Sequence, residues 1–136
     1  MPYTLGKQLS AANDNTIKGT PITNQRYVMF GEQLLYVKAG SWIKLKNNNT
    51  YGIQCAQFNQ SNGECVQFFG ITLSQNESSA NLFRKIPFNQ DCYIRFTIRR
   101  KDDNPEPPNT EQEATEQNVQ DYLDQLEIHL IIEKKN

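Results

Sequence analysis

The stretch that decides the fold is DCYIRFTIRRK, residues 91–101. Its apolar side chains stand at every second position, with polar or cationic side chains between them. Because successive side chains of a strand point to opposite faces, the stretch is predicted to be a half-buried β-strand. The apolar face carries Cys92, Ile94, Phe96 and Ile98, and the other face carries Tyr93, Arg95, Thr97 and Arg99. Such a strand requires neighbours on both edges and a second layer over its apolar face.

Other short segments with strand-like patterns supply those neighbours. They are residues 26–30, 33–38, 41–46, 50–58, 64–73, 81–88 and 125–133. Turn residues recur about every eight to twelve positions, and no helical pattern repeats between them. The order is typical of an all-β fold, and we predict an antiparallel β-sandwich of the jelly-roll type.

The sequences of the individual segments allow more specific predictions about turns, edges and inward-facing side chains. Gly31 and Glu32 are predicted to form a turn between two strands, and Pro87 fits an edge strand. Within residues 41–46 and 50–58, the side chains predicted to face the core are Ile43, Leu45, Tyr51, Ile53 and Cys55. Within residues 125–133 they are Leu126, Ile128, Leu130 and Ile132.

The two ends of the chain differ from the strand-rich centre. Residues 1–25 are polar and are predicted to form an N-terminal arm or edge segment, and residues 26–136 a single β-sandwich domain. A Pro-rich acidic insert, residues 102–124, precedes the last strand, and its part from residue 111 is predicted as either a short polar helix or a loop. The N-terminus lacks the apolar stretch of a signal peptide, so we expect synthesis in a cytoplasm.

Charge is unevenly distributed along the chain. The net charge is −1, which gives no case for nucleic acid or for a membrane surface. Residues 1–101 nevertheless carry about +7, and residues 102–136 about −8. Either the acidic part folds back on the basic body or is solvated, or it docks onto a basic partner.

No catalytic residues, metal site or cofactor are predicted, and we expect a protein that is not an enzyme. The only histidine, His129, has outward parity on a strand, where an inert role is the commoner one. Asp102, Asp103 and Asn104 form only a weak candidate for a cation site, because neither a fixed glycine nor a distal glutamate accompanies them. Cys55 and Cys65 flank a predicted hairpin and are favoured as free thiols over a disulfide.

Four stretches occur in an order that resembles a known family. They are YVKAGSWIKL (36–45), TYGIQCAQFN with its NQSNG turn (50–63), YIRFTIRRKDD (93–103) and QLEIHLIIE (125–133). The order resembles the carbohydrate-binding-module-like jelly-roll domains of phage tail and minor structural proteins. The resemblance covers roughly residues 26–133, and it implies a virion component, in a tail or head fibre, that adheres to the host.

Sugar binding requires aromatic planes for the ring face and fixed polar groups for the hydroxyls. The candidate carbohydrate-binding residues are Trp42, Tyr51, Tyr93, Arg95 and Arg99. For Trp42 the alternative is a loop or subunit contact. For the face with Tyr93 and Arg95 it is a second buried sheet surface, or salt bridges to residues 111–124.

These observations predict a non-enzymatic phage virion protein, located in the virion, that binds host-surface glycan or a neighbouring virion subunit. The alternative is a purely structural decoration, fibre or connector subunit that oligomerises through its N-terminal arm. The expected partners are other virion proteins and further copies of the chain. A third expected partner is host-surface glycan. Neither binding to nucleic acid nor insertion into a membrane is expected.

Overall fold

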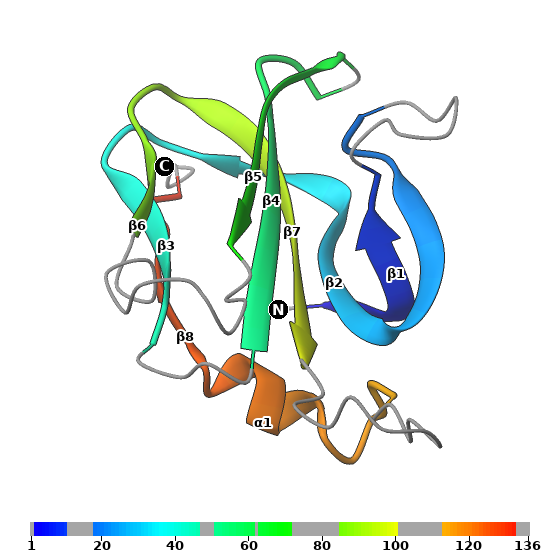
Figure 1. Ribbon diagram of the computed structural model, residues 1–136. Helices are drawn as coiled ribbons and strands as arrows, with labels where there is room; N and C mark the ends of the chain where they lie inside the picture. Colours follow the sequence, from blue (N-terminus) through cyan, green and yellow to red (C-terminus); the bar gives the residue numbers. More distant parts are fainter. Residues whose placement is uncertain are drawn as a thin grey trace.

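The computed structural model describes residues 2–10, 18–46, 51–61, 63–71, 85–100 and 113–132, and it has two antiparallel sheets. The five-stranded sheet has the order β1 (Tyr3–Leu9), β2 (Pro21–Val37), β7 (Cys92–Arg100), β4 (Tyr51–Phe58) and β5 (Cys65–Ile71). The three-stranded sheet has the order β6 (Lys85–Phe88), β3 (Ser41–Leu45) and β8 (Leu126–His129). A short helix, α1 (Val119–Leu123), lies at one end (Figure 1). The predicted all-β antiparallel sandwich is confirmed.

Strand β7, the stretch from which the sequence analysis starts, is the middle strand of the larger sheet. It pairs with β2 on one edge and with β4 on the other. Its predicted apolar face is buried between the sheets, where the rings of Phe96 and Phe30 stack with centroids 4.9 Å apart. The inward parities of Ile43 and Leu45 on β3 are also confirmed, since both side chains are fully buried.

Helix α1 closes one end of this core. Val119 and Tyr122 are its buried residues, and Tyr122 meets Tyr51 edge to face at 5.3 Å between ring centroids. Of the two predictions for residues 111–124, a short helix is therefore the one observed. No helix in the described part of the chain is long and apolar enough to cross a membrane.

A third layer covers the opposite face of the larger sheet. Strands β1 and β2 curl back over that face, as the blue and cyan strands at the right of Figure 1 show. Leu9 and Met29 from these strands form a second small core with Ala56 and Phe58 of β4. Gln54 joins the layers, because its amide accepts from the backbone N–H of Leu9 at 2.9 Å and donates to the carbonyl of Leu9 at 3.3 Å.

The structure corrects two predictions. Gly31 and Glu32 do not end a strand, because β2 continues through them as one strand with a bulge. Ile132 does not face the core, and 65% of it is exposed, because it lies beyond the end of β8 at His129, whereas Leu130 still packs against the core. The boundary proposed between residues 25 and 26 falls inside β2.

The remaining predictions concern the cysteines, Pro87 and the candidate cation site. All three cysteines are free, and β4–β5 pairing places Cys55 opposite Phe69 and Cys65 opposite Phe58. Strand β6, which contains Pro87, lies at an edge as predicted. The candidate cation turn at residues 102–104 lies outside the described residues.

Candidate functional site

The larger sheet has a bulge in β2 where this strand pairs with β7. Phe30 pairs with Phe96 and Leu35 pairs with Ile94, so residues 31–34 of β2 stand opposite Arg95 alone. Gly31 begins the bulge at a φ of 90°. A Cβ added there would lie 3.0 Å from the carbonyl oxygen of Ile94, so both the backbone angle and the space require glycine. We call residues 31–34 the β2 bulge.

Arg95 holds the β2 bulge in place. Its Nε donates to the carbonyl of Gly31 at 2.8 Å, and its Nη2 donates to the carbonyl of Glu32 at 2.9 Å. Its Nη1 donates to the carbonyl of Gly19 at 3.2 Å, in the connection between β1 and β2. Burial lowers the pKa of the guanidinium, and the nearby Glu32 carboxylate opposes that shift. One side chain therefore fixes both the bulge and the turn that lies over the sheet.

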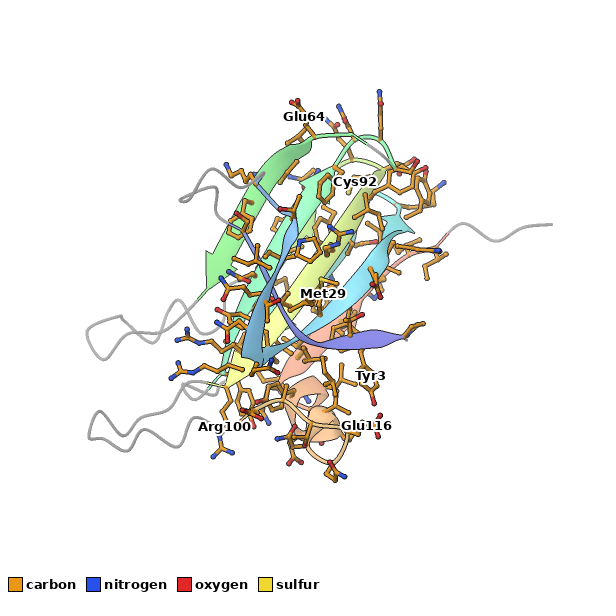
Figure 2. All side chains as sticks on the ribbon, turned by 90° about the vertical axis from the view of Figure 1, so that its right-hand side faces the viewer. Tyr3, Met29, Glu64, Cys92, Arg100 and Glu116 are labelled. Atoms are coloured by element: carbon orange, nitrogen blue, oxygen red, sulfur yellow. The ribbon has the colours of Figure 1, made fainter. Side chains whose placement is uncertain are left out.

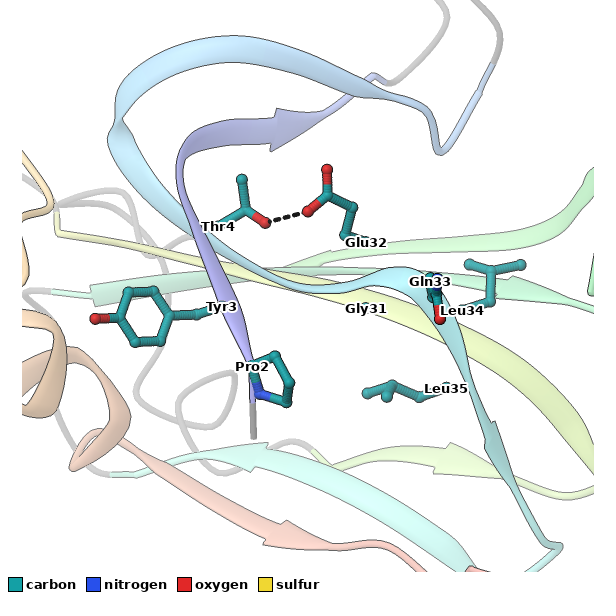
Figure 3. A pocket seen from close by; sticks show the side chains of 8 residues that line it. All are labelled: Pro2, Tyr3, Thr4, Gly31, Glu32, Gln33, Leu34 and Leu35. Carbon is teal, nitrogen blue, oxygen red and sulfur yellow. Dashed lines mark hydrogen bonds between the residues drawn. The ribbon is translucent and has the colours of Figure 1, made fainter.

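The β2 bulge separates two hollows that share Glu32, Gln33 and Leu34. The first, of about 470 Å³, lies toward the start of β1, and the residues that line it are Pro2, Tyr3, Thr4, Gly31, Glu32, Gln33, Leu34 and Leu35 (Figure 3). The second, of about 550 Å³, lies toward the β4–β5 turn, and its residues are Thr20, Glu32, Gln33, Leu34, Phe58, Ser61, Gly63 and Arg95. The bulge thus forms a ridge between two open recesses.

Polar groups with different roles line these recesses. The hydroxyl of Thr4 donates to Oε2 of Glu32 at 2.9 Å, which orients the carboxylate. Gln33 is exposed at the crest and offers both donor and acceptor atoms. Pro2 and Leu35 form an apolar side of the first hollow (Figure 3). Within the described residues, no group of three or more histidine, cysteine or acidic side chains is placed to bind a metal.

The polar face of β7 is divided rather than continuous. Tyr93 is half-buried and meets Tyr36 edge to face at 5.3 Å. Thr97, fully buried, donates to the Gln54 amide that also binds Leu9, and so it lies beneath the third layer. This covered position separates Arg95 from Arg99 along the strand.

Arg99 has its own surroundings at the far end of that face. Its guanidinium lies 5.9 Å from the ring centre of Tyr27. Its Nε is buried without a hydrogen-bond partner among the described residues. Nothing about this geometry links Arg99 to the hollows beside the β2 bulge.

The remaining predicted site residues lie elsewhere. Tyr51 is buried in the main core, where burial raises the pKa of its hydroxyl. Trp42 is half-buried on the outer face of the three-stranded sheet. The two hollows beside the β2 bulge thus do not bring the five residues together, and of the five Arg95 is the one that lines the second hollow.

Sequence reasoning missed Thr4, Glu32, Gln33 and Ser61 as candidate site residues. The one available signal was the Gly31–Glu32 pair, which correctly marked an irregular backbone but indicated a turn. Its partner, Arg95, stands more than sixty positions later in the chain. No local sequence pattern predicts a contact between residues that are so far apart in the sequence.

Comparison with known proteins adds no family to this description. The chain matches no protein-family model, no curated protein and no solved structure.

Proposed function

We propose that the chain is a non-enzymatic adhesion subunit of a phage particle that binds neutral saccharides at the β2 bulge. The observation that carries this proposal is the bulge itself. Three hydrogen bonds from Arg95 fix it, and it presents Glu32 and Gln33 between two open hollows. A β-bulge that is fixed by hydrogen bonds commonly orients side chains toward a ligand.

The chemistry of the exposed groups fits sugar hydroxyls. A hydroxyl both donates and accepts, so it pairs with a carboxylate through its proton and with an amide N–H through its oxygen. Glu32 supplies the carboxylate, and Gln33 supplies both kinds of amide atom. Pro2 and Leu35 offer apolar surface of the kind that covers the C–H face of a pyranose ring.

The size and openness of the hollows favour weak, shallow binding. Their volumes of about 470 and 550 Å³ lie within the range of small-molecule sites. A ligand that rests on an open surface loses little water, so we expect affinity in the millimolar range, about −4 kcal/mol. Adhesion then depends on several copies engaging one surface together. The order of strand motifs that resembles virion domains supports this setting.

Nuclear magnetic resonance titration of the ¹⁵N-labelled chain tests the proposal. The probes are glucose, galactose, mannose and N-acetylglucosamine, each added to saturation. At least one is expected to give saturable amide shifts confined to residues 3–4 and 31–35, Ser61 and Gly63. Gln33→Ala should abolish them, while the matched control Gln117→Ala, at another exposed amide, should not.

The charge of Glu32 provides a second readout. Galacturonate should bind at least about fivefold more weakly than galactose, because two carboxylates repel at short range. Glu32→Gln should reduce the difference in affinity between galactose and galacturonate. No shift at the β2 bulge with any of the four sugars, or shifts that survive Gln33→Ala, would contradict the proposal.

A further inference from the structure

The outer face of the three-stranded sheet is built around Trp42. This residue pairs with Pro87 of β6 on one side and with His129 of β8 on the other. The imidazole of His129 stacks on the indole, with centroids 5.6 Å apart and ring planes 23° apart. The Nζ of Lys85 lies 4.3 Å from the centre of the indole. The ring therefore has a neighbour from each of the strands that flank β3, and it is half-buried.

Lysines dominate the other half of this face. Lys44 pairs directly with Lys85 on one side and with Glu127 on the other, and Lys46 is exposed just beyond. Like charges directly opposite each other on neighbouring strands destabilise the pair. Three lysines against one glutamate leave the face positive, so a carboxylate from outside would relieve the repulsion. We call this surface the Trp42 face, and its residues are Trp42, Lys44, Lys46, Lys85, Pro87, Glu127 and His129.

The end of the molecule that carries α1 has more carboxylates than basic groups among the described residues, although Arg100 also lies there, near Tyr51 and Tyr122 (Figure 2). Its exposed carboxylates are Glu113, Glu116, Asp121 and Asp124. Residues 113–132 contain no lysine or arginine. Figure 2 places Glu116 at the far end of the molecule from Glu64, and Figure 1 places α1 at the end of the sandwich and the small sheet at its side. We call the four carboxylates the acidic end.

We propose that copies of this chain associate head to tail, with the acidic end of one copy bound to the Trp42 face of the next. The charges are complementary, and the half-buried Trp42 with the exposed Pro87 and the 39% exposed Ile131 supplies apolar contact area. A two-fold contact between two Trp42 faces would instead oppose two positive surfaces. A head-to-tail contact generates a ring or a filament. This association is independent of saccharide binding, although it would provide the multiple copies that weak binding requires.

Charge-reversal variants and sedimentation velocity at low ionic strength test the association. The wild-type chain should form species larger than a dimer, and salt should dissociate them because the contact is electrostatic. Lys46→Glu/Lys85→Glu removes the basic side, and Glu113→Lys/Glu116→Lys removes the acidic side. Each variant alone should be monomeric, with association weakened at least about tenfold. Glu64→Lys, at the other end of the molecule, is the control and should associate normally.

An equal mixture of the two double variants gives the decisive result. Each pair of unlike variants retains the wild-type acidic end of one against the wild-type Trp42 face of the other. In the second contact the reversed end, now basic, meets the reversed face, now acidic, so the charges are complementary there too. The mixture should therefore again form species larger than a dimer. A wild-type chain that is monomeric at low salt, a mixture that stays monomeric, or an acidic-end variant that still self-associates would each overturn the proposal. Circular dichroism of each variant verifies that it is folded.

Discussion

The outer faces of the two sheets have similar sequence patterns. Another part of the chain covers one face, whereas the described residues leave the other face exposed. Each shows an aromatic residue with cationic residues at alternating positions, Tyr93 and Arg95 on β7 and Trp42 and Lys44 on β3. On the larger sheet, the curled β1–β2 layer covers the middle of that face, and Arg95 binds the carbonyls of the covering backbone. On the smaller sheet, the described residues leave the Trp42 face exposed.

The difference shows what alternation along a strand does and does not determine. It determines which side chains share a face, and here it did so correctly on both sheets. It does not determine whether a remote segment of the same chain lies over that face. An arginine on a covered face stabilises the fold, while lysines on an open face are available to a partner.

Arg95→Met is expected to have the largest effect, because it leaves three backbone carbonyls without their donor. Hydrogen bonds from charged groups contribute about 1.5–3 kcal/mol each and are not additive, so we expect a loss of about 3 kcal/mol. Arg99→Met is the matched control on the same face and should cost less than about 1 kcal/mol. Guanidinium unfolding curves of both variants measure the difference, and equal losses would mean that Arg95 does not hold the layer.

Gly31→Ala should come next, at about 2 kcal/mol. It combines a left-handed backbone angle with a Cβ placed 3.0 Å from a main-chain oxygen. Gly40→Ala is a sharp comparison, because Gly40 has a similar φ of 95° but its nearest neighbour is a side-chain methyl of Ile131 at 3.4 Å. We expect about 1 kcal/mol there. Thermal unfolding distinguishes them, and the reverse order would show that the β2 bulge tolerates a side chain.

Trp42→Ala should have a smaller effect on the stability of the monomer, because the indole is only half-buried. We expect about 1 kcal/mol in dilute solution, well below the cost of removing a core aromatic ring. Its main effect should be on association between copies, where an aromatic contact commonly contributes 2 kcal/mol or more. Unfolding and sedimentation of the same sample separate the two quantities. A large loss of stability without loss of association would make Trp42 a core residue.

Alkaline pH should destabilise the fold through Tyr51 and Tyr122, without any effect near neutral pH. Burial, with the neighbouring Tyr51, raises the pKa of Tyr122 to about 12, and burial also raises that of Tyr51. The unfolded chain releases these protons near pH 10, before the folded chain does, so stability should fall as the pH rises from about 10 to 12. Tyr122→Phe should flatten that decline. Unfolding curves at several pH values measure the decline, and an equally steep decline in Tyr122→Phe would contradict the prediction.

Much of the fold was predictable from local patterns. The period-two stretches gave β3, β4 and β7 with correct inward faces, because burial between two sheets requires such alternation. The β2 bulge was not predictable, since glycine followed by a polar residue also marks ordinary turns, and Arg95 lies far away in sequence. The exposure of Ile132 was missed because apolar alternation in the sequence continues beyond His129, where β8 ends.

The candidate site was less predictable than the fold, for a physical reason. Parity identified Arg95 and Trp42 as outward-facing, but their roles depend on which remote atoms they meet. Arg95 meets backbone carbonyls from two parts of the β1–β2 layer, and Trp42 meets side chains from β6 and β8. Contacts between segments so distant in sequence are not reflected in the periodicity of the sequence.

Fluorescence quenching of Trp42 tests the open character of its face most directly, because it is the only tryptophan in the chain. Acrylamide quenching is measured on dilute protein and on concentrated protein at low ionic strength, and again on the concentrated protein after addition of salt. The structure predicts ready quenching in dilute solution, protection at high concentration, and recovery of quenching with salt. Quenching that is unchanged by concentration while the protein sediments as an oligomer would contradict the account, because another surface would then join the copies.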